Sequence, residues 1–493
     1  MTTVDAYAPA PVTRPRAARA WIARHPVAPL AAVMAVLYAV TSLQRFATYK
    51  SAGYDLGLID QVVTNYARFR PPYAPIAGPH VNMLGDHFSP MLAMFAPLYW
   101  VWADPRMLLL GQAALVAISV FPVHRFARRR LGDRTALWIA GGYALGWPLQ
   151  ALVSYDVHDV AFAVPLIAFA VDALDRRADG TLILTCLGLV LVKEDMGLVV
   201  LVLGLVRLFG HRPRRAGFAV IAIGVVGYLV ATAVVIPMLS SHGGVTHWSY
   251  DALGPDLPSA LASIVLHPLH AAGLFLWSPP VKSATLVVLL LPVLGLCLRS
   301  PYVLAALPLL AERFFSETHT LWGPFFHYSA TVWPILVLAA VDCAARLRDR
   351  GHVSMPRLLA GSVTGFAVVG TALAGTLFPM HALLVPSSYD TGAVADHAAV
   401  VAAIPASTCV EADDRLVPHL THTNLVSDPG KLGRAPDFVA LDLARSDSGT
   451  SSPSTRAVRA AVERDGYEQV MRRGDVVLYR SPDYAGPSVG CRP

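Results

Sequence analysis

The sequence predicts an all-α bundle that crosses a membrane many times and is followed by a small α/β domain. Of the 493 residues, 55% are hydrophobic and only 15% are charged, and the mean hydropathy is +0.51. Apolar runs near the length that crosses a bilayer, roughly 20 residues, recur along the chain. From about residue 384 these runs give way to short β-like segments separated by Pro and Gly. This composition argues against a soluble protein.

Eleven apolar runs are predicted to cross the membrane. They are 27–45, 106–124, 135–152, 160–174, 181–192, 196–209, 216–238, 283–298, 301–315, 329–346 and 356–379. Residues 1–26 are basic and rich in Pro and Ala, and we expect them to form a disordered cytoplasmic tail. The first run lacks a small-residue cleavage site, so it is interpreted as a span and not as a signal peptide.

Basic residues predict the orientation of the bundle. With the N-terminus inside, the loops "HRFARRRLGDR", "DRRADG", "GHRPRR", "LRSP" and "ARLRDRGH" all lie on the cytoplasmic side, as the positive-inside rule requires. The apolar segment 89–102 is short and broken by Pro97, and counting it as a span would move "RFARRR" outside. We therefore expect an interfacial or re-entrant helix there, with the N-terminus inside and the C-terminus outside. Because the basic residues cluster in loops between spans, nucleic-acid binding is not predicted.

Three parts of the chain follow from this topology: the tail 1–26, a membrane domain 27–383 with a first outer loop 46–105, and an extracytoplasmic α/β domain 384–493. Strands are expected in "STCVEADDRLVPHL", "APDFVALDLA" and "GDVVLYRS", and a helix in "SPSTRAVRAAVERDGY". Cys409 and Cys491 could pair if this domain faces an oxidising compartment. The other three cysteines lie in apolar runs and are interpreted as packing residues.

Acids and histidines gather on the predicted outer side. An ionised carboxylate in hydrocarbon is costly, so ionisable residues within or beside a span are candidates for function. The candidates are Asp55, Asp60, His80, Asp86, His87, Asp156, His158, Asp159, Glu194, Asp195, His242, His247, Glu317, His319 and His327.

Lys193, Glu194 and Asp195 form the most concentrated group of charges. They lie in "LVLVKEDMGLVVLV", between two apolar half-runs. The group is either a tight outside turn or a charged break at membrane depth, and in both cases it needs a cavity shielded from lipid. The alternative is that Lys193 pairs with a carboxylate merely to close a helical hairpin.

Two further motifs have both functional and structural interpretations. "SYDVHDV" places Asp156, His158 and Asp159 at a helix end, where they could form a metal site or a hydrogen-bond relay, or a solvated turn with Asp159 as an N-cap. "GDHFSP" places Asp86 and His87 before the interfacial helix, where Asp86 could act only as a cap.

The segment "AGYDLGLIDQVVTNYARF" follows the first span. Its apolar stripe predicts a helix that lies along the outer interface. Asp55 is expected at the start of this helix, as a functional acid or as an N-cap, and Asp60 is expected to face solvent. Further along the chain, "FSETHTLWGPFFHYS" places His327 and Tyr328 beside the start of a span.

Taken together, "YDLGLIDQ", "DHFSP", "YDVHD", "VKED", "HYS" and "RLVPHLTH" resemble a bacterial membrane family named domain of unknown function 2079, from about residue 40 to about residue 480. The layout in turn resembles the GT-C class of integral-membrane glycosyltransferases, in particular its protein O-mannosyltransferase and aminoarabinose-transferase branch. Those proteins have many spans, interfacial helices in a long first outer loop, and an acid shortly after the first span. This likeness is an analogy at the level of the fold.

The resemblance implies a function in the bacterial plasma membrane. A sugar would move from a polyprenyl-phosphate donor to an extracytoplasmic cell-envelope acceptor by inverting displacement. By position Asp55 resembles the base that takes the acceptor proton, and Lys193 is expected to meet the leaving phosphate. The remaining donor-binding candidates are His158, Asp159, Glu194, Asp195, Arg313, His327 and Tyr328. The candidates for acceptor binding or support are Tyr54, Asp86, His87 and Asp156.

Two features keep alternatives open. Members of the GT-C class often carry adjacent acids after the first span, whereas Asp55 and Asp60 stand five residues apart. Some members need a divalent cation, but no DxD motif lies in the first outer loop, so the sequence names no metal ligand.

A multi-pass transporter or flippase is the main alternative, although no internal repeat is apparent. A non-enzymatic assembly or sensory protein is the third.

Overall fold

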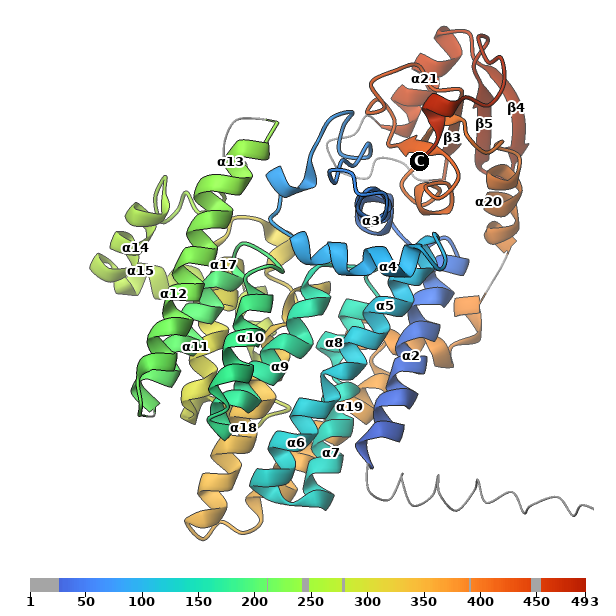
Figure 1. Cartoon of the computed structure of the whole chain (residues 1–493). Coiled ribbons are helices and arrows are strands. Elements are labelled where there is room, and N and C mark those ends of the chain that lie inside the picture. The colour runs from blue at the N-terminus through green and yellow to red at the C-terminus, as the bar shows by residue number, and fades with distance from the viewer. Residues whose placement is uncertain (1–25, 211, 242–247, 277–279, 390–391, 445–453) are drawn as a thin grey trace, which may run out of the picture.

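The computed structural model describes residues 26–210, 212–241, 248–276, 280–389, 392–444 and 454–493. A bundle of upright helices makes up most of the molecule, and a small domain with a β-sheet sits on one end of it (Figure 1). The helices of the bundle are α2 (Val27–Ala47), α5 (Pro105–Ile118), α6 (Val120–Leu131), α7 (Asp133–Ala144), α8 (Trp147–Val153), α9 (Val160–Arg176), α10 (Asp179–Leu189), α11 (Met196–Gly210), α12 (Arg215–Leu229), α13 (Ile236–Leu239), α14 (Leu257–Leu266), α15 (Pro268–Leu276), α16 (Val281–Leu290), α17 (Leu307–Phe315), α18 (Val332–Asp349) and α19 (Met355–Leu373).

Helix α18 is the centre of the bundle. Every residue from Val332 to Ala345 is buried, which means that neighbouring helices cover all sides of α18. A helix that is apolar all round is expected at such a position. By contrast, α12 presents much of its surface outward, with Phe218 and Val226 among its exposed residues, as expected of a helix at the lipid-facing edge.

Five helical segments are long and apolar enough to cross a membrane, or up to seven if each bent helix pair forms one span. The five are Val27–Ala47, Pro105–Leu131, Arg215–Leu239, His327–Asp349 and Met355–Leu373. Several other predicted spans correspond to shorter apolar helices, including α10, α11 and α16. The chain is therefore a multi-pass membrane protein, while the count of eleven spans and the orientation stay predictions.

The first outer loop contains short helices that lie across the ends of the upright ones (Figure 1). These are α3 (Leu58–Ala67), preceded by the π-helical turn η1 (Gly53–Gly57), and α4 (Ala96–Tyr99), preceded by the 3-10 turn η3 (Pro90–Phe95). The apolar segment Pro90–Val101 is too short to cross a bilayer, which agrees with its interpretation as an interfacial helix.

The end of the bundle opposite the small domain carries a network of ion pairs, since α6 and α18 both end there (Figure 1). Asp172 is fully buried and pairs with Arg129 at 2.7 Å and with Arg176 at 3.0 Å. Asp342 pairs with Arg346 at 2.9 Å. Several arginines that the sequence predicts on the cytoplasmic side are thus fixed at helix ends by buried carboxylates.

The C-terminal domain is a five-stranded sheet with a helix on each face. The strand order is β2-β1-β3-β5-β4, in which β1 is parallel to β2 and β3, and β5 is antiparallel to β3 and β4. The elements are α20 (Gly392–Ala402), β1 (Cys409–Ala412), β2 (Leu425–Ser427), β3 (Phe438–Asp442), α21 (Thr455–Arg464), β4 (Glu468–Arg473) and β5 (Val476–Arg480). Alternation along β5 explains the two faces, because Leu478 packs in the core with α20 whereas Val477 packs with α21.

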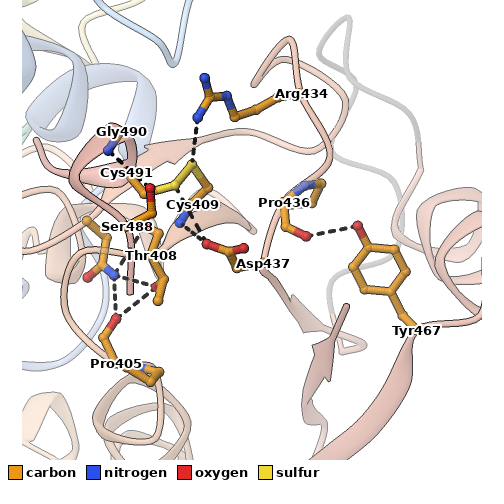
Figure 2. Close-up of a disulfide and its surroundings, with 11 residues drawn as sticks. Pro405, Thr408, Cys409, Arg434, Pro436, Asp437, Tyr467, Ser488, Gly490 and Cys491 are labelled. Atoms are coloured by element: carbon orange, nitrogen blue, oxygen red, sulfur yellow. Dashed lines mark hydrogen bonds between the residues drawn. A yellow bond between two sulfur atoms is a disulfide. The ribbon is translucent and has the colours of Figure 1, made fainter. Parts of the chain in front are cut away.

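A disulfide between Cys409 and Cys491 ties the C-terminus of the chain to strand β1 (Figure 2). The Asp437 carboxylate accepts a hydrogen bond from the Cys409 N–H at 2.8 Å beside it. Cys186, Cys297 and Cys343 are buried and unpaired with one another, in agreement with their interpretation as packing residues.

The C-terminal domain and the first outer loop share a hydrophobic core. Tyr49 and Ile76 of the loop belong to the same buried cluster as Val417 and Leu420 of the domain. A shared core fixes the position of the domain on the bundle, since moving it would expose these side chains to water.

Candidate active site

Asp55 lies in η1, whose first turn is anchored by carboxylates from two distant parts of the chain. Ala52 precedes the turn and offers no side-chain cap, so the first backbone N–H groups need other acceptors. The Ala52 N–H donates to Asp156 Oδ2 at 2.7 Å. The Gly53 and Tyr54 N–H groups both donate to Asp414 Oδ1, at 2.8 and 3.2 Å. Asp55 therefore stands on a rigid turn.

Asp156 lies between α8 and α9 with a φ of 58°, in the left-handed region that Asp tolerates better than most residues. Gln112 of α5 stabilises this turn with two hydrogen bonds. Its amide N–H donates to the Asp156 carbonyl, and its Oε1 accepts from the His158 N–H at 3.0 Å. Burial raises the pKa of Asp156 to about 6, while its bond from Ala52 opposes the rise. Asp156 thus contacts the turn that carries Asp55, and its role in acceptor binding or support stays a prediction.

His158 reaches the carboxylate of Asp55. Its Nε2 lies 3.4 Å from Asp55 Oδ1. The other side of the His158 ring stacks on His327, with ring centroids 3.6 Å apart, and Tyr155 lies beside both rings. Within the part of the chain that the structure describes, neither Nδ1 of His158 nor Nδ1 of His327 has a hydrogen-bond partner. The fold thus joins Asp55, His158 and His327 in one cluster, with Tyr328 next to His327.

Glu194 holds the "GDHFSP" turn to the break between α10 and α11. Its Oε1 lies 3.0 Å from His87 Nδ1, and its Oε2 accepts from the Phe88 N–H at 3.0 Å. Burial alone would lower the pKa of His87, but the Glu194 carboxylate outweighs it and raises the pKa. Asp86 lies on the other side of the ring, 3.9 Å from His87 Nε2.

Lys193 pairs with a residue outside its own helical hairpin. Its Nζ lies 3.5 Å from Oε1 of Glu312, which belongs to α17. Asp195 adjoins the same pair. The alternative in which Lys193 only closes the α10–α11 hairpin therefore does not describe its contact, because the partner comes from another helix.

Asp159 lies between the two clusters. It caps α9, with its Oδ1 accepting from the Val160 N–H at 2.7 Å. Burial raises its pKa, and the positive charges of Lys193, His87 and His158 oppose the rise. Asp159 is thus within electrostatic reach of residues from both groups, His158 of the Asp55 group and Lys193 of the Glu194 group.

Arg313 of α17 organises the loop that carries His327 and Tyr328. It is buried, and its guanidinium donates to the Leu321 carbonyl at 2.9 Å and to Ser329 Oγ at 3.0 Å. A third bond reaches the Gly323 carbonyl at 3.0 Å. These bonds define a structural contact, and a contribution of Arg313 to donor binding stays a prediction.

Other predicted residues lie away from this region or face elsewhere. The ring of Tyr54 packs under the Lys431 ammonium of the C-terminal domain, with Nζ 4.7 Å from the ring centroid. Glu317 Oε1 accepts from the Ala252 N–H at 3.0 Å. His242 and His247 lie outside the described residues.

The expectation that Asp60 faces solvent is wrong. Asp60 is only 1% exposed, and it accepts a hydrogen bond from the Tyr99 hydroxyl. Burial raises its pKa to about 6, while hydrogen bonds from Tyr99 and Thr421 oppose the rise. The sequence pattern placed Asp60 on the open face of an interfacial helix, but α4 and the C-terminal domain cover that face.

A family model described as a predicted membrane protein, DUF2079, matches residues 45–478. The chain belongs to this family. The match confirms the resemblance found in the sequence motifs. A comparison with curated proteins found no match.

Among solved structures, two of ArnT from Cupriavidus metallidurans are similar to this DUF2079 protein. The structure bound to undecaprenyl phosphate has a TM-score of 0.55 and 13% identity, over 94% of this chain and 99% of that one. The apo structure has a TM-score of 0.55 and 14% identity, over 94% of this chain and 98% of that one. The oligosaccharyltransferase of Archaeoglobus fulgidus, in complex with Zn and sulfate, has a TM-score of 0.35 and 12% identity, over 83% of this chain and 68% of that one. The full-length likeness to ArnT shows that this family member has a GT-C fold.

Three residues that contact predicted site residues or the Asp55 turn in this DUF2079 protein were not identified from the sequence: Gln112, Glu312 and Asp414. Gln112 and Glu312 lie within predicted spans, where a polar side chain is itself a signal for function. Asp414 follows strand β1 in "EADDR", and nothing in that stretch relates it to residues near 53.

One cluster of potential metal ligands lies in the C-terminal domain. Among the described residues, one group of three has ligand atoms close enough to hold an ion, namely Cys409, Asp437 and Cys491. Both cysteines are engaged in the disulfide, so this group does not fit a metal. The use of a divalent cation by some GT-C enzymes, for which the sequence names no ligand here, is left to the assays described below.

Proposed function

We propose that this protein is a membrane glycosyltransferase that moves a sugar from a polyprenyl-phosphate donor to a cell-envelope acceptor outside the plasma membrane. The observation that carries the proposal is the placement of Asp55 in the first outer loop of a GT-C fold, on an anchored turn and 3.4 Å from His158. The undecaprenyl phosphate bound to the similar ArnT structure supports a donor on a polyprenyl carrier.

In this reaction, Asp55 accepts the proton of an acceptor hydroxyl. The acceptor oxygen attacks the anomeric carbon while the bond from that carbon to the phosphate oxygen breaks. The electron pair leaves with the polyprenyl phosphate, and the configuration at the anomeric carbon inverts. His158 holds the Asp55 carboxylate in the orientation that proton transfer needs, because a general base must lie within hydrogen-bond reach of the acceptor.

Lys193 is the cation that we assign to the leaving phosphate. A positive charge that is in place before the reaction stabilises the departing anion without reorganisation. Glu312, 3.5 Å from Lys193 Nζ, holds the ammonium before the donor arrives. Asp159, which adjoins both Lys193 and His158, is suited to bind sugar hydroxyls between the two.

We further propose that the C-terminal domain and the Asp55 turn face the outside of the cell. The disulfide between Cys409 and Cys491 supports this, since disulfides persist in oxidising compartments. The Arg–Asp network at the opposite end of the bundle supports it independently, because basic residues are retained on the cytoplasmic side.

The test compares the purified wild type with Asp55→Asn in detergent, using a panel of polyprenyl-phosphate sugars with a cell-envelope extract as the source of acceptor, and measuring the release of polyprenyl phosphate. Asp349→Asn is the matched control, because Asp349 lies at the opposite end of the bundle. We expect release by the wild type and the control and its loss in Asp55→Asn, with equal melting temperatures. Parallel assays with EDTA or Mg²⁺ decide the cation requirement. No release from any donor by a folded wild type would contradict the proposal and favour a carrier or a sensory protein.

A further inference from the structure

We propose that the C-terminal domain is part of the active site and that Asp414 is the residue through which it positions Asp55. This inference rests on the proposed function, because it assigns a role to Asp55 in transfer. It also makes a structural claim that can be tested without any transfer assay.

The contact between Asp414 and the Asp55 turn is specific in geometry. One carboxylate oxygen accepts two consecutive backbone N–H groups, those of Gly53 at 2.8 Å and Tyr54 at 3.2 Å. Hydrogen bonds from N–H groups to a carboxylate are stronger than neutral ones, and a negative charge is favoured at the N-terminus of a helix. Asp55 is the next residue, so the direction of its side chain depends on the turn that Asp414 holds.

The two backbones also approach closely at this point. A Cβ atom on Gly53 would lie 2.8 Å from Val417 Cβ and 3.0 Å from the Asp414 carbonyl oxygen. A Cβ atom on Gly57, one turn further, would lie 2.9 Å from Val417 Cγ1. Glycine at both positions lets the 414–417 segment rest directly on the Asp55 turn, which leaves no room for the turn to shift.

The position of Asp414 is set in turn by the sheet. Asp414 follows strand β1. The N–H of the preceding residue, Asp413, donates to the Ala440 carbonyl of β3 at 3.0 Å. The Leu416 N–H closes the turn on the Asp413 carbonyl at 2.8 Å. On the other flank, His419 stacks on Tyr49 with ring centroids 3.8 Å apart. A correctly folded domain is therefore required to place the Asp414 carboxylate at the Asp55 turn.

The experiment uses the full-length protein with Asp414→Ala, Asp414→Asn and Asp437→Ala. Asparagine keeps an oxygen that can accept the same two N–H groups, whereas alanine does not. Asp437 is the matched control, because it also accepts a backbone N–H in this domain, that of Cys409 at 2.8 Å, but its partner lies within the domain. We measure kcat and KM for release of polyprenyl phosphate, the melting temperature, and hydrogen exchange of peptides covering 50–58.

We expect Asp414→Ala to lower kcat about 10- to 100-fold, as for a misplaced reacting group, with KM changed less than about threefold. Asp414→Asn should recover most of kcat, and Asp437→Ala should keep wild-type kcat. Exchange at 50–58 should accelerate in Asp414→Ala alone. Wild-type kcat and exchange in a folded Asp414→Ala would overturn the inference, as would an equal loss of kcat in Asp437→Ala. If the wild type releases nothing, the proposed function fails, and exchange at 50–58 still decides whether Asp414 positions the turn.

Discussion

His158 and Asp55 meet across the interface between the first outer loop and the α8–α9 turn, with His158 Nε2 3.4 Å from Asp55 Oδ1. His327 stacks on the His158 ring with a centroid separation of 3.6 Å. The stack limits rotation of the His158 ring, and Gln112 fixes its backbone through the bond to the His158 N–H. The imidazole is therefore held where it can orient one oxygen of Asp55.

This relationship predicts that His158→Ala lowers kcat for release of polyprenyl phosphate, by about 10- to 100-fold, since positioned proton-transfer groups contribute about 10²- to 10⁴-fold. His158→Gln should recover part of the loss, because a glutamine amide can donate to Asp55. The measurement is steady-state release by the folded variants. His319→Ala is the control, since that ring lies beside Trp322. Equal rates for wild type and His158→Ala would remove His158 from the mechanism.

A second prediction concerns pH. Burial raises the pKa of Asp60 from 3.8 to about 6, so the folded protein binds the proton more tightly than the unfolded chain does. The stabilising effect of protonated Asp60 is complete below pH 3.8 and is lost as pH rises through 6. By this linkage, ionised Asp60 lowers the free energy of unfolding by about 3 kcal/mol at pH 7.5.

Asp60→Asn should therefore raise the melting temperature relative to the wild type at pH 7.5 and much less at pH 4.5. Thermal unfolding in detergent at a series of pH values measures this difference. Asp465→Asn, a change in the loop after α21, is the control and should show no such trend. A difference between Asp60→Asn and wild type that stays constant over this range would contradict the buried, protonated state of Asp60.

The close approach of Gly57 and Val417 predicts a compensating pair. Alanine favours a helix over glycine by about 1 kcal/mol, yet the new Cβ would lie 2.9 Å from Val417 Cγ1 and 3.0 Å from Ile76 Cδ1. Gly57→Ala should therefore lower the melting temperature, since overpacking costs about 1 to 3 kcal/mol. Val417→Ala removes the Cγ1 methyl that obstructs the new Cβ, so the double variant should be more stable than the sum of the single changes predicts. Strict additivity would show that the two segments do not touch.

The disulfide predicts a redox effect confined to the C-terminal domain. It closes a loop between residues that are 82 positions apart, and native disulfides typically contribute about 2 to 4 kcal/mol. Cys409→Ser with Cys491→Ser should lower the melting temperature and accelerate hydrogen exchange in β1. Mass spectrometry of the membrane-expressed protein without reductant should find Cys409 joined to Cys491. Free thiols at both positions would argue against an oxidising compartment.

The sequence alone determined the membrane class and much of the layout. Apolar runs predict helices, and most helices of the bundle lie within or close to the predicted runs, but α14 and α15 lie between the runs 216–238 and 283–298 and were missed. The short β-like segments that form β1, β3 and β5 were also found, because each is a largely apolar run that is buried in the sheet. Two strands were missed for physical reasons. β2 has only three residues, and β4, "EQVMRR", is polar and mostly exposed, so neither carries an apolar signal.

The tertiary structure alone decided which polar residues surround Asp55. The sequence grouped acids and histidines on one side of the membrane, and the family resemblance drew attention to Asp55, His158 and Lys193. The sequence did not relate Asp414 to Gly53 or Glu312 to Lys193, and it predicted that Asp60 faces solvent. The periodicity of a local sequence pattern reflects one helix or strand, whereas a hydrogen bond between distant segments produces no periodic pattern. The contacts that hold the Asp55 turn exist only in the folded protein, because the α8–α9 turn brings the Asp156 carboxylate and the packed C-terminal domain brings the Asp414 carboxylate to its unpaired N–H groups.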